Sequence, residues 1–230
     1  MKPLLLIALF VPLCTAARAA VTFTTTLNAT TTIPDNDDTG TVSHMTITPD
    51  TGDVPSARQI EIITNVSVGL NFSDGWNGDL FVYLVHDSGF AILLNRIGRE
   101  EGNPDGNGTS GMAVTLDDSA SGNIHQPLSN SGILTGTHQP DGRNTDPDSV
   151  LASDPRTALL SSFNGLNAAG QWTLFVADLN PGDQSTLQSW TLTITAVPEP
   201  CSAALLLGAC LLAVRRGRPA PHVGSEGRLG

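Results

Sequence analysis

The sequence predicts an all-β fold: a jelly-roll-like β-sandwich flanked by an N-terminal signal helix and a short C-terminal apolar helix. Between residues 21 and 196, short β-branched and apolar runs are interrupted every 8–15 residues by Gly, Asn, Asp or Pro. The same region holds no long apolar stripe with helical spacing, and it is rich in Thr, Ser, Gly, Asn and Asp. Many short strands joined by turns are typical of sandwiches and jelly rolls.

Seven runs are predicted to be strands because they alternate or concentrate β-branched and apolar residues. They are residues 21–27, 59–70, 80–85, 91–94, 112–116, 172–177 and 187–195. His86-Asp87-Ser88-Gly89 predicts a tight hairpin turn between the third and fourth runs. Residues 124–162 are polar and contain several prolines, which predicts long loops over one end of the sandwich. Trp172 and Trp190 are expected to face the core, an exposed stacking platform being the alternative.

The N-terminus has the three parts of a secretion signal. Lys2 precedes an apolar stretch over residues 4–13, and Ala17-Arg18-Ala19 has the small-x-small pattern that signal peptidase accepts. The apolar stretch is too short to remain as a spanning helix. We therefore expect a signal peptide over residues 1–19 and a sandwich domain over residues 20–196.

The charge and the cysteines restrict the possible partners. Residues 21–196 contain 20 acidic residues, five arginines and no lysine. A domain this acidic repels nucleic acid phosphates, so nucleic acid is excluded as a partner and cations are favoured. The three cysteines, Cys14, Cys201 and Cys210, all lie in the terminal apolar segments, which predicts a domain without a disulfide.

The C-terminus combines a Pro-Glu-Pro motif, an apolar run over residues 201–214 and an arginine cluster. As a helix the run is about 21 Å long, less than the roughly 30 Å of a bilayer core. This order resembles the PEP-CTERM sorting signal of Gram-negative bacteria, which implies recognition by an exosortase; a plain membrane anchor is the alternative. The sorting tail is expected over residues 197–219, followed by an extension over residues 220–230. The predicted processing residues are Ala19, Pro198, Glu199, Pro200, Arg215, Arg216 and Arg218.

Four motifs together resemble the P domain, or Homo B domain, of proprotein convertases and subtilisin-like proteases. They are Ile33-Pro34-Asp35-Asn36, then Gly78-Asp79-Leu80-Phe81, then Asp117-Asp118-Ser119-Ala120, and finally Gly170-Gln171-Trp172-Thr173 with Leu187-Gln188-Ser189-Trp190. The resemblance extends over residues 33–194 and implies a jelly-roll domain of the kind that usually follows and stabilises a subtilisin-like catalytic domain. Ser73-Asp74 and an insertion around residues 141–156 depart from the family pattern. Gly78-Asp79 is expected to mark a strand entrance where the carboxylate caps a backbone turn.

Catalytic motifs are incomplete. Gly108-Thr109-Ser110-Gly111-Met112-Ala113 resembles the nucleophile turn of subtilisin-like proteases, but no matching Asp and His motifs precede it, so a glycine-rich loop is expected. Asp38-Thr39-Gly40 and Asp50-Thr51-Gly52 are interpreted as turns. The five histidines lack zinc spacing and are expected to be solvated loop residues. The chain is therefore predicted not to be an enzyme.

Aspartates cluster in several predicted loops, and carboxylate oxygens are the ligands that Ca²⁺ prefers. An EF-hand is excluded because Thr46 stands where its bidentate Glu is needed. A different calcium site remains a hypothesis, with ordinary turn capping as the alternative. The candidate metal ligands are Asp35, Asp37, Asp38, Asp74, Asp79, Asp117, Asp118, Asp178 and Asp183.

The predicted function is that of a non-catalytic exported P-domain module. It would be a structural, adhesive or protein-binding component of the bacterial surface or exopolysaccharide matrix, held briefly in the inner membrane. Its expected partners are signal peptidase and exosortase during export, and then a surface protein or a polysaccharide. A carbohydrate-binding module, with Trp76 as its binding residue, is one alternative. A protein associated with a serine endopeptidase is the other.

Overall fold

The computed structural model describes residues 20–48, 61–126 and 132–198. The predicted terminal helices lie outside these residues, as do Ala19, Glu199, Pro200 and the arginine cluster Arg215, Arg216 and Arg218. Among the described residues, no helix has the length and apolarity that a membrane crossing needs.

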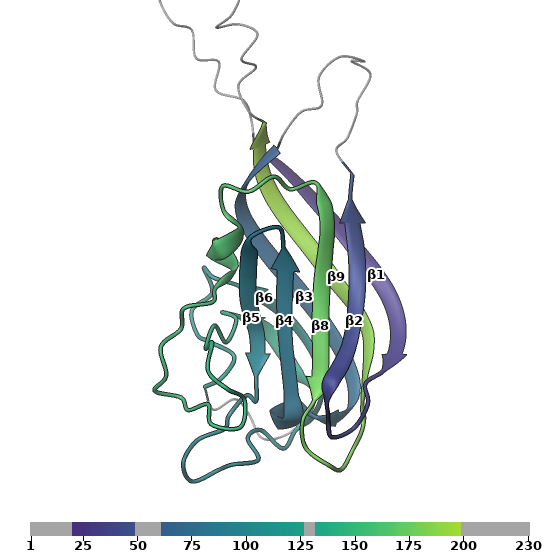
Figure 1. Ribbon diagram of the computed structural model, residues 1–230, viewed down its shortest axis with the longest axis vertical. Coiled ribbons are helices and arrows are strands. Elements are labelled where there is room, and N and C mark those ends of the chain that lie inside the picture. The colour runs from purple at the N-terminus through teal and green to yellow at the C-terminus, as the bar shows by residue number, and fades with distance from the viewer. Residues whose placement is uncertain (1–19, 49–60, 127–131, 199–230) are drawn as a thin grey trace, which may run out of the picture. The chain divides into compact units, whose positions relative to one another are not determined.

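Two sheets form a β-sandwich, as the sequence predicts (Figure 1). The five-stranded sheet has the order β1–β9–β3–β6–β7, formed by Val21–Thr32, Ser185–Pro198, Glu61–Trp76, Ser110–Asp117 and Leu134–His138. The four-stranded sheet has the order β2–β8–β4–β5, formed by Asp37–Ile47, Gly170–Asp178, Leu80–His86 and Gly89–Asn95. Neighbouring strands are antiparallel except β6 and β7. Two 3₁₀ turns, η1 (Asn77–Asp79) and η2 (Leu160–Phe163), complete the described structure.

The core lies between the sheets because apolar residues alternate with polar ones along the strands. In β4, Leu80, Val82 and Leu84 are buried, whereas the intervening side chains face outward. Trp172 in β8 and Trp190 in β9 are fully buried, so the prediction that they face the core is confirmed. Each indole N–H has a partner, the Ala168 carbonyl at 3.1 Å and the Ser43 hydroxyl at 3.0 Å respectively.

The hairpin between β4 and β5 is also as predicted. His86 pairs with Gly89, and Asp87 takes a left-handed backbone conformation with φ of 51°. Gly89 is required because a Cβ at this position would lie 2.7 Å from a ring carbon of Phe163. A short turn and a close ring contact thus fix the hairpin against η2.

Two strands were not predicted. β2 begins at Asp37, one residue before the Asp38-Thr39-Gly40 motif for which the sequence predicts a turn, and its pairing with β8 is irregular between Asp37 and Thr41, where Gly40 has φ of 53°. β7 lies in the segment that was interpreted as loop and pairs with β6. Both are edge strands with few buried side chains, so neither has a strong alternating pattern.

The expected long loops lie elsewhere than predicted. Residues 139–159 run beside β5 and not over an end of the sandwich (Figure 1). Asp141 N–H donates to the Leu93 carbonyl at 3.0 Å, and Ile92 N–H donates to the Ala158 carbonyl at 3.0 Å. Backbone groups of the edge strand β5 are therefore satisfied by the chain itself.

Ser110, expected in a glycine-rich loop, is the first residue of β6.

Candidate functional site

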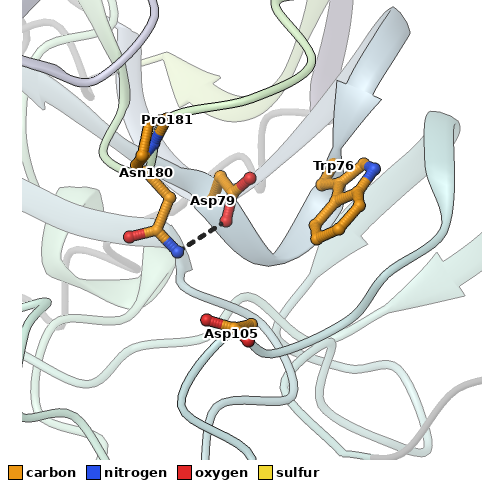
Figure 2. A pocket seen from close by; sticks show the side chains of 5 residues that line it. All are labelled: Trp76, Asp79, Asp105, Asn180 and Pro181. Carbon is orange, nitrogen blue, oxygen red and sulfur yellow. Dashed lines mark hydrogen bonds between the residues drawn. The ribbon is translucent and has the colours of Figure 1, made fainter.

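A pocket of about 260 Å³ opens where β3 ends and where the loop after β8 begins. It is lined by Trp76, Asp79, Asp105, Asn180 and Pro181 (Figure 2). Trp76 is the last residue of β3 and keeps 43% of its surface exposed. Asp105 is exposed on another side of the pocket. The indole ring of Trp76 and the carboxylates of Asp79 and Asp105 therefore surround the same pocket.

The turn η1 holds Asp79 in this position. The Asn77 side-chain amide donates to the Thr109 hydroxyl and to the Gly111 carbonyl, each at 2.9 Å. Gly78 N–H donates to the Asn107 carbonyl at 2.8 Å, and a Cβ on Gly78 would lie 2.6 Å from the Asn107 nitrogen. Only glycine allows this approach of two backbone segments.

Asp79 is buried, and its charge is poorly compensated. Its carboxylate accepts a hydrogen bond from the Asn180 side-chain amide at 3.0 Å, and not from the backbone turn that the sequence interpretation expected. The Arg96 guanidinium lies 3.9 Å away, and it donates instead to the carbonyls of Gly78 and Pro104. Burial and the negative charge of Asp178 therefore raise the pKa of Asp79 to about 6, against a smaller opposing effect of Arg96.

Asp178 is a second buried carboxylate at the same end of the sandwich. It is the last residue of β8 and pairs with Asp37 on one side and Leu80 on the other. Burial raises the pKa of Asp178, and its Oδ1 has no hydrogen-bond partner among the described residues. Its Oδ2 accepts a long hydrogen bond of 3.4 Å from Ser185 N–H. The sandwich thus concentrates incompletely solvated negative charge behind the pocket.

The other candidate metal ligands are spread over turns. Asp35, Asp37, Asp117 and Asp118 accept hydrogen bonds from the backbone N–H groups of Gly182, Thr39, Ser119 and Ser161, respectively. Asp37 and Asp117 thus cap their own turns, which is the alternative to calcium binding, whereas Asp35 and Asp118 accept from segments distant in the chain. Asp74 accepts from the Ser73 hydroxyl at 2.9 Å, and Asp38 and Asp183 are exposed. Within the described ranges, no group of three or more His, Cys, Asp or Glu side chains is arranged to hold a metal ion. Calcium binding stays a prediction.

Two histidines are buried, and the expectation that they are solvated is wrong for them. The His86 ring stacks on Trp172 with centroids 4.0 Å apart, and its nitrogens lie 2.9 and 2.7 Å from the carbonyls of Gln171 and Asn167. His125 Nδ1 lies 2.7 Å from the Asp141 carboxylate. Both rings are thus occupied in the packing of the domain.

Among the histidines that the structure describes, none is placed to activate Ser110. The other two described histidines contact threonine oxygens: the Thr173 hydroxyl for His44, and the Thr135 carbonyl for His138. In the part of the chain that the structure describes, no histidine therefore has a hydrogen bond to a serine hydroxyl. A serine nucleophile needs such a base.

One surface was missed by the sequence interpretation. The outer face of the four-stranded sheet carries an aromatic cluster, with Tyr83 and Phe175 stacked at 4.5 Å and with Phe81 and Phe90 beside Tyr83. All four side chains are half-buried. The signal was present in the alternation of β4, where Phe81 and Tyr83 occupy the positions between buried residues.

Residues 134–194 match the family model of the proprotein convertase P-domain. This segment is P-domain-like. Within it the resemblance that the sequence analysis described is confirmed. Comparison with curated proteins gives no significant match.

Two solved structures resemble the fold. One is the Aeromonas sobria serine protease in complex with the chaperone ORF2, with 16% identity and a TM-score of 0.43, covering 79% of this chain and 28% of that chain. The other is the serine protease of Aeromonas sobria, with the same identity and TM-score, covering 77% and 27%. The chain therefore spans little more than a quarter of the length of these protease chains.

Proposed function

We propose that this P-domain-like chain is a non-catalytic, exported binding module, and that the pocket beside Trp76 takes up a lysine or arginine side chain of a surface protein. The observation that carries the proposal is the pocket itself, in which an exposed indole stands beside a buried carboxylate with a raised pKa. An indole face attracts a cation by about 0.5–2 kcal/mol, depending on its desolvation. The two carboxylates Asp79 and Asp105 add charge attraction.

The protonation of Asp79 links this binding to pH. A cation favours the ionised carboxylate, whereas burial favours the neutral form up to a pH of about 6. Affinity for a cationic group is therefore expected to rise as the pH increases from 5 to 7, through the pKa of about 6.

A pair of peptides tests the proposal. We would titrate the protein by calorimetry at pH 7 with a short peptide carrying one arginine and with the same peptide carrying citrulline, its uncharged counterpart. The arginine peptide is expected to bind more tightly, and Trp76→Ala is expected to weaken it by roughly 3–30-fold. Trp76→Phe, which keeps an aromatic face, is the matched control and should retain most of the affinity. Equal binding of both peptides would contradict the proposal.

Export and tail removal are a second part of the proposal. The signal-like residues up to Ala19 and the Pro198-Glu199-Pro200 motif before the apolar run support it. Expression in a Gram-negative host that has an exosortase, followed by intact-mass measurement of the secreted protein, tests both cleavages. A secreted product that begins near Ala20 and ends near Pro200 is expected. A product that keeps the apolar run in the membrane would instead indicate a permanent anchor.

Two other functions make different predictions. A carbohydrate-binding module should retain polysaccharide in a pull-down, and Trp76→Ala should abolish this retention. A protein with its own endopeptidase activity should hydrolyse casein, and Ser110→Ala should abolish that hydrolysis. If the chain is instead an accessory domain of a separate protease, the chain alone should neither retain polysaccharide nor hydrolyse casein.

A further inference from the structure

We propose that the outer edge of β1 is a strand-addition site, and that a second copy of this chain pairs with it in antiparallel orientation. β1 is the first strand of the five-stranded sheet and lies at its outside (Figure 1). It pairs with β9, and no other described strand borders it. An unpaired strand edge presents a row of N–H and C=O groups that another strand can complete.

The other three edges of the sandwich are protected. β5 is covered by residues 139–159, which hydrogen-bond to Ile92 and Leu93. β7 is only five residues long. β2 carries Asp37 and Asp38, and its pairing is irregular at its start. Coverage, short length, charge and irregularity are the ways in which natural sheets avoid pairing with other chains.

β1 has none of these features over most of its length. Its sequence, VTFTTTLNATTT, contains no charged residue and no proline. Its pairing with β9 is regular from Val21 to Asn28, and an irregularity follows only between Asn28 and Thr31. Eight regular residues correspond to roughly 27 Å of open edge.

The edge of β1 that pairs with β9 indicates which kind of strand the free edge of β1 can bind. Thr22, Thr24 and Thr26 face three threonines of β9, and their hydroxyls lie 3.1, 3.2 and 2.8 Å from those partners. β1 itself carries the same alternation of threonine with other residues. Cross-strand threonine pairs stabilise a sheet. The β1 strand of a second copy would therefore present threonines to the free edge of β1, just as β9 presents threonines to its bonded edge.

A pairing centred on Thr24 matches both faces. It places Thr24 opposite Thr24 of the other copy and Thr22 opposite Thr26, on the exposed face. On the other face it places Val21 opposite Leu27 and Phe23 opposite Thr25, and the three apolar side chains keep part of their surface in water. Residues directly opposite in an antiparallel pair share one face, so this register gathers threonines on the exposed face and three apolar side chains, together with Thr25, on the other.

Charge also favours this edge for self-association. The chain has a formal net charge of −11, so two copies repel each other over most of their surface. The uncharged β1 lets them approach without bringing like charges together. The contact is small compared with the roughly 1,200–2,000 Å² of a stable interface, so we expect a dimer that dissociates on dilution.

Analytical ultracentrifugation of the full chain over a wide concentration range tests the proposal. Wild-type protein is expected to pass from monomer to dimer, and Thr24→Lys is expected to weaken the association by roughly tenfold or more, since it places two ammonium groups opposite each other. Thr115→Lys is the matched control, because Thr115 is exposed on β6, an inner strand of the same sheet, and carries the same charge change. It should associate like the wild type.

Hydrogen exchange gives a second, independent measurement. At high concentration the amides of β1 should exchange more slowly than at low concentration, and Thr24→Lys should remove this difference while its melting curve stays cooperative. If the wild type stays monomeric at all concentrations, the proposal is overturned. This result would also be obtained if another segment of the same chain occupied the edge of β1. A dimer that Thr24→Lys leaves unchanged also overturns it, because it forms elsewhere.

Discussion

Replacing Asp79 by asparagine is expected to stabilise the domain at neutral pH, although it removes a charge that lies near Arg96. The pKa of Asp79 is raised from 3.8 to about 6 because the carboxyl group is buried and lies near Asp178. Each pKa unit corresponds to about 1.4 kcal/mol. A shift of about two units therefore makes the ionised carboxylate cost about 3 kcal/mol of folding free energy above pH 6.

The sign follows from where the proton is held. Because the folded-state pKa is above the unfolded value, the folded protein keeps the Asp79 proton to a higher pH than the unfolded chain does. The stabilising contribution of the neutral form is complete below about pH 4 and is lost as the pH rises to about 6. Asparagine stays neutral throughout, and its side-chain oxygen can still accept the hydrogen bond from Asn180.

Urea denaturation of the wild type and of Asp79→Asn between pH 4 and pH 8 measures the effect. The two proteins should have similar stability near pH 4, and the variant should be more stable by about 3 kcal/mol at pH 7, or by roughly 6–12 °C in Tm. Asp105→Asn, on the exposed rim of the same pocket, is the control and should change stability little. If Asp79→Asn is less stable than the wild type at pH 7, the carboxylate is compensated by contacts that the structure does not show, and the argument is refuted.

Three further predictions concern the packing of the domain and the calcium hypothesis. Asp141→Ala is expected to cost about 3–5 kcal/mol in urea denaturation, because it leaves the buried Arg143 and His125 without their carboxylate; a loss under 1 kcal/mol would show that the network relaxes. Trp190→Ala is expected to cost about 3–5 kcal/mol and Trp76→Ala less than about 1 kcal/mol, since only the former is buried; equal losses would contradict the assignment of core and rim. If calcium binds the folded domain, Tm should be higher in excess calcium than with a chelator, and unchanged Tm would remove the hypothesis.

The parts of the fold that were predicted are those with a local signal. The β4–β5 hairpin follows from alternation and a four-residue turn motif, and Trp190 lies within a strongly apolar strand. β2 and β7 lack such a signal because each buries only one side chain, Met45 in β2 and Leu134 in β7. Their pairing depends on long-range contacts that no local pattern contains.

The pocket shows the same limit. Trp76 was selected from the sequence as an exposed aromatic residue, and Asp79 as one carboxylate among many. Nothing in the sequence places Asn180 beside Asp79, because about a hundred residues separate them in the chain. The raised pKa of Asp79 depends on that arrangement and on burial, so it too required the structure.

The absence of a side chain at Gly78 has a consequence for recognition. Since the backbone of Asn107 lies directly against Gly78, the segment that carries Asp105 is fixed to the turn that carries Asp79, and the two walls of the hollow keep a constant separation. A ligand that enters the pocket would bind a preorganised site, and little of its binding free energy would be spent on ordering that site. Selection among guests should then depend on their size and shape as much as on their charge.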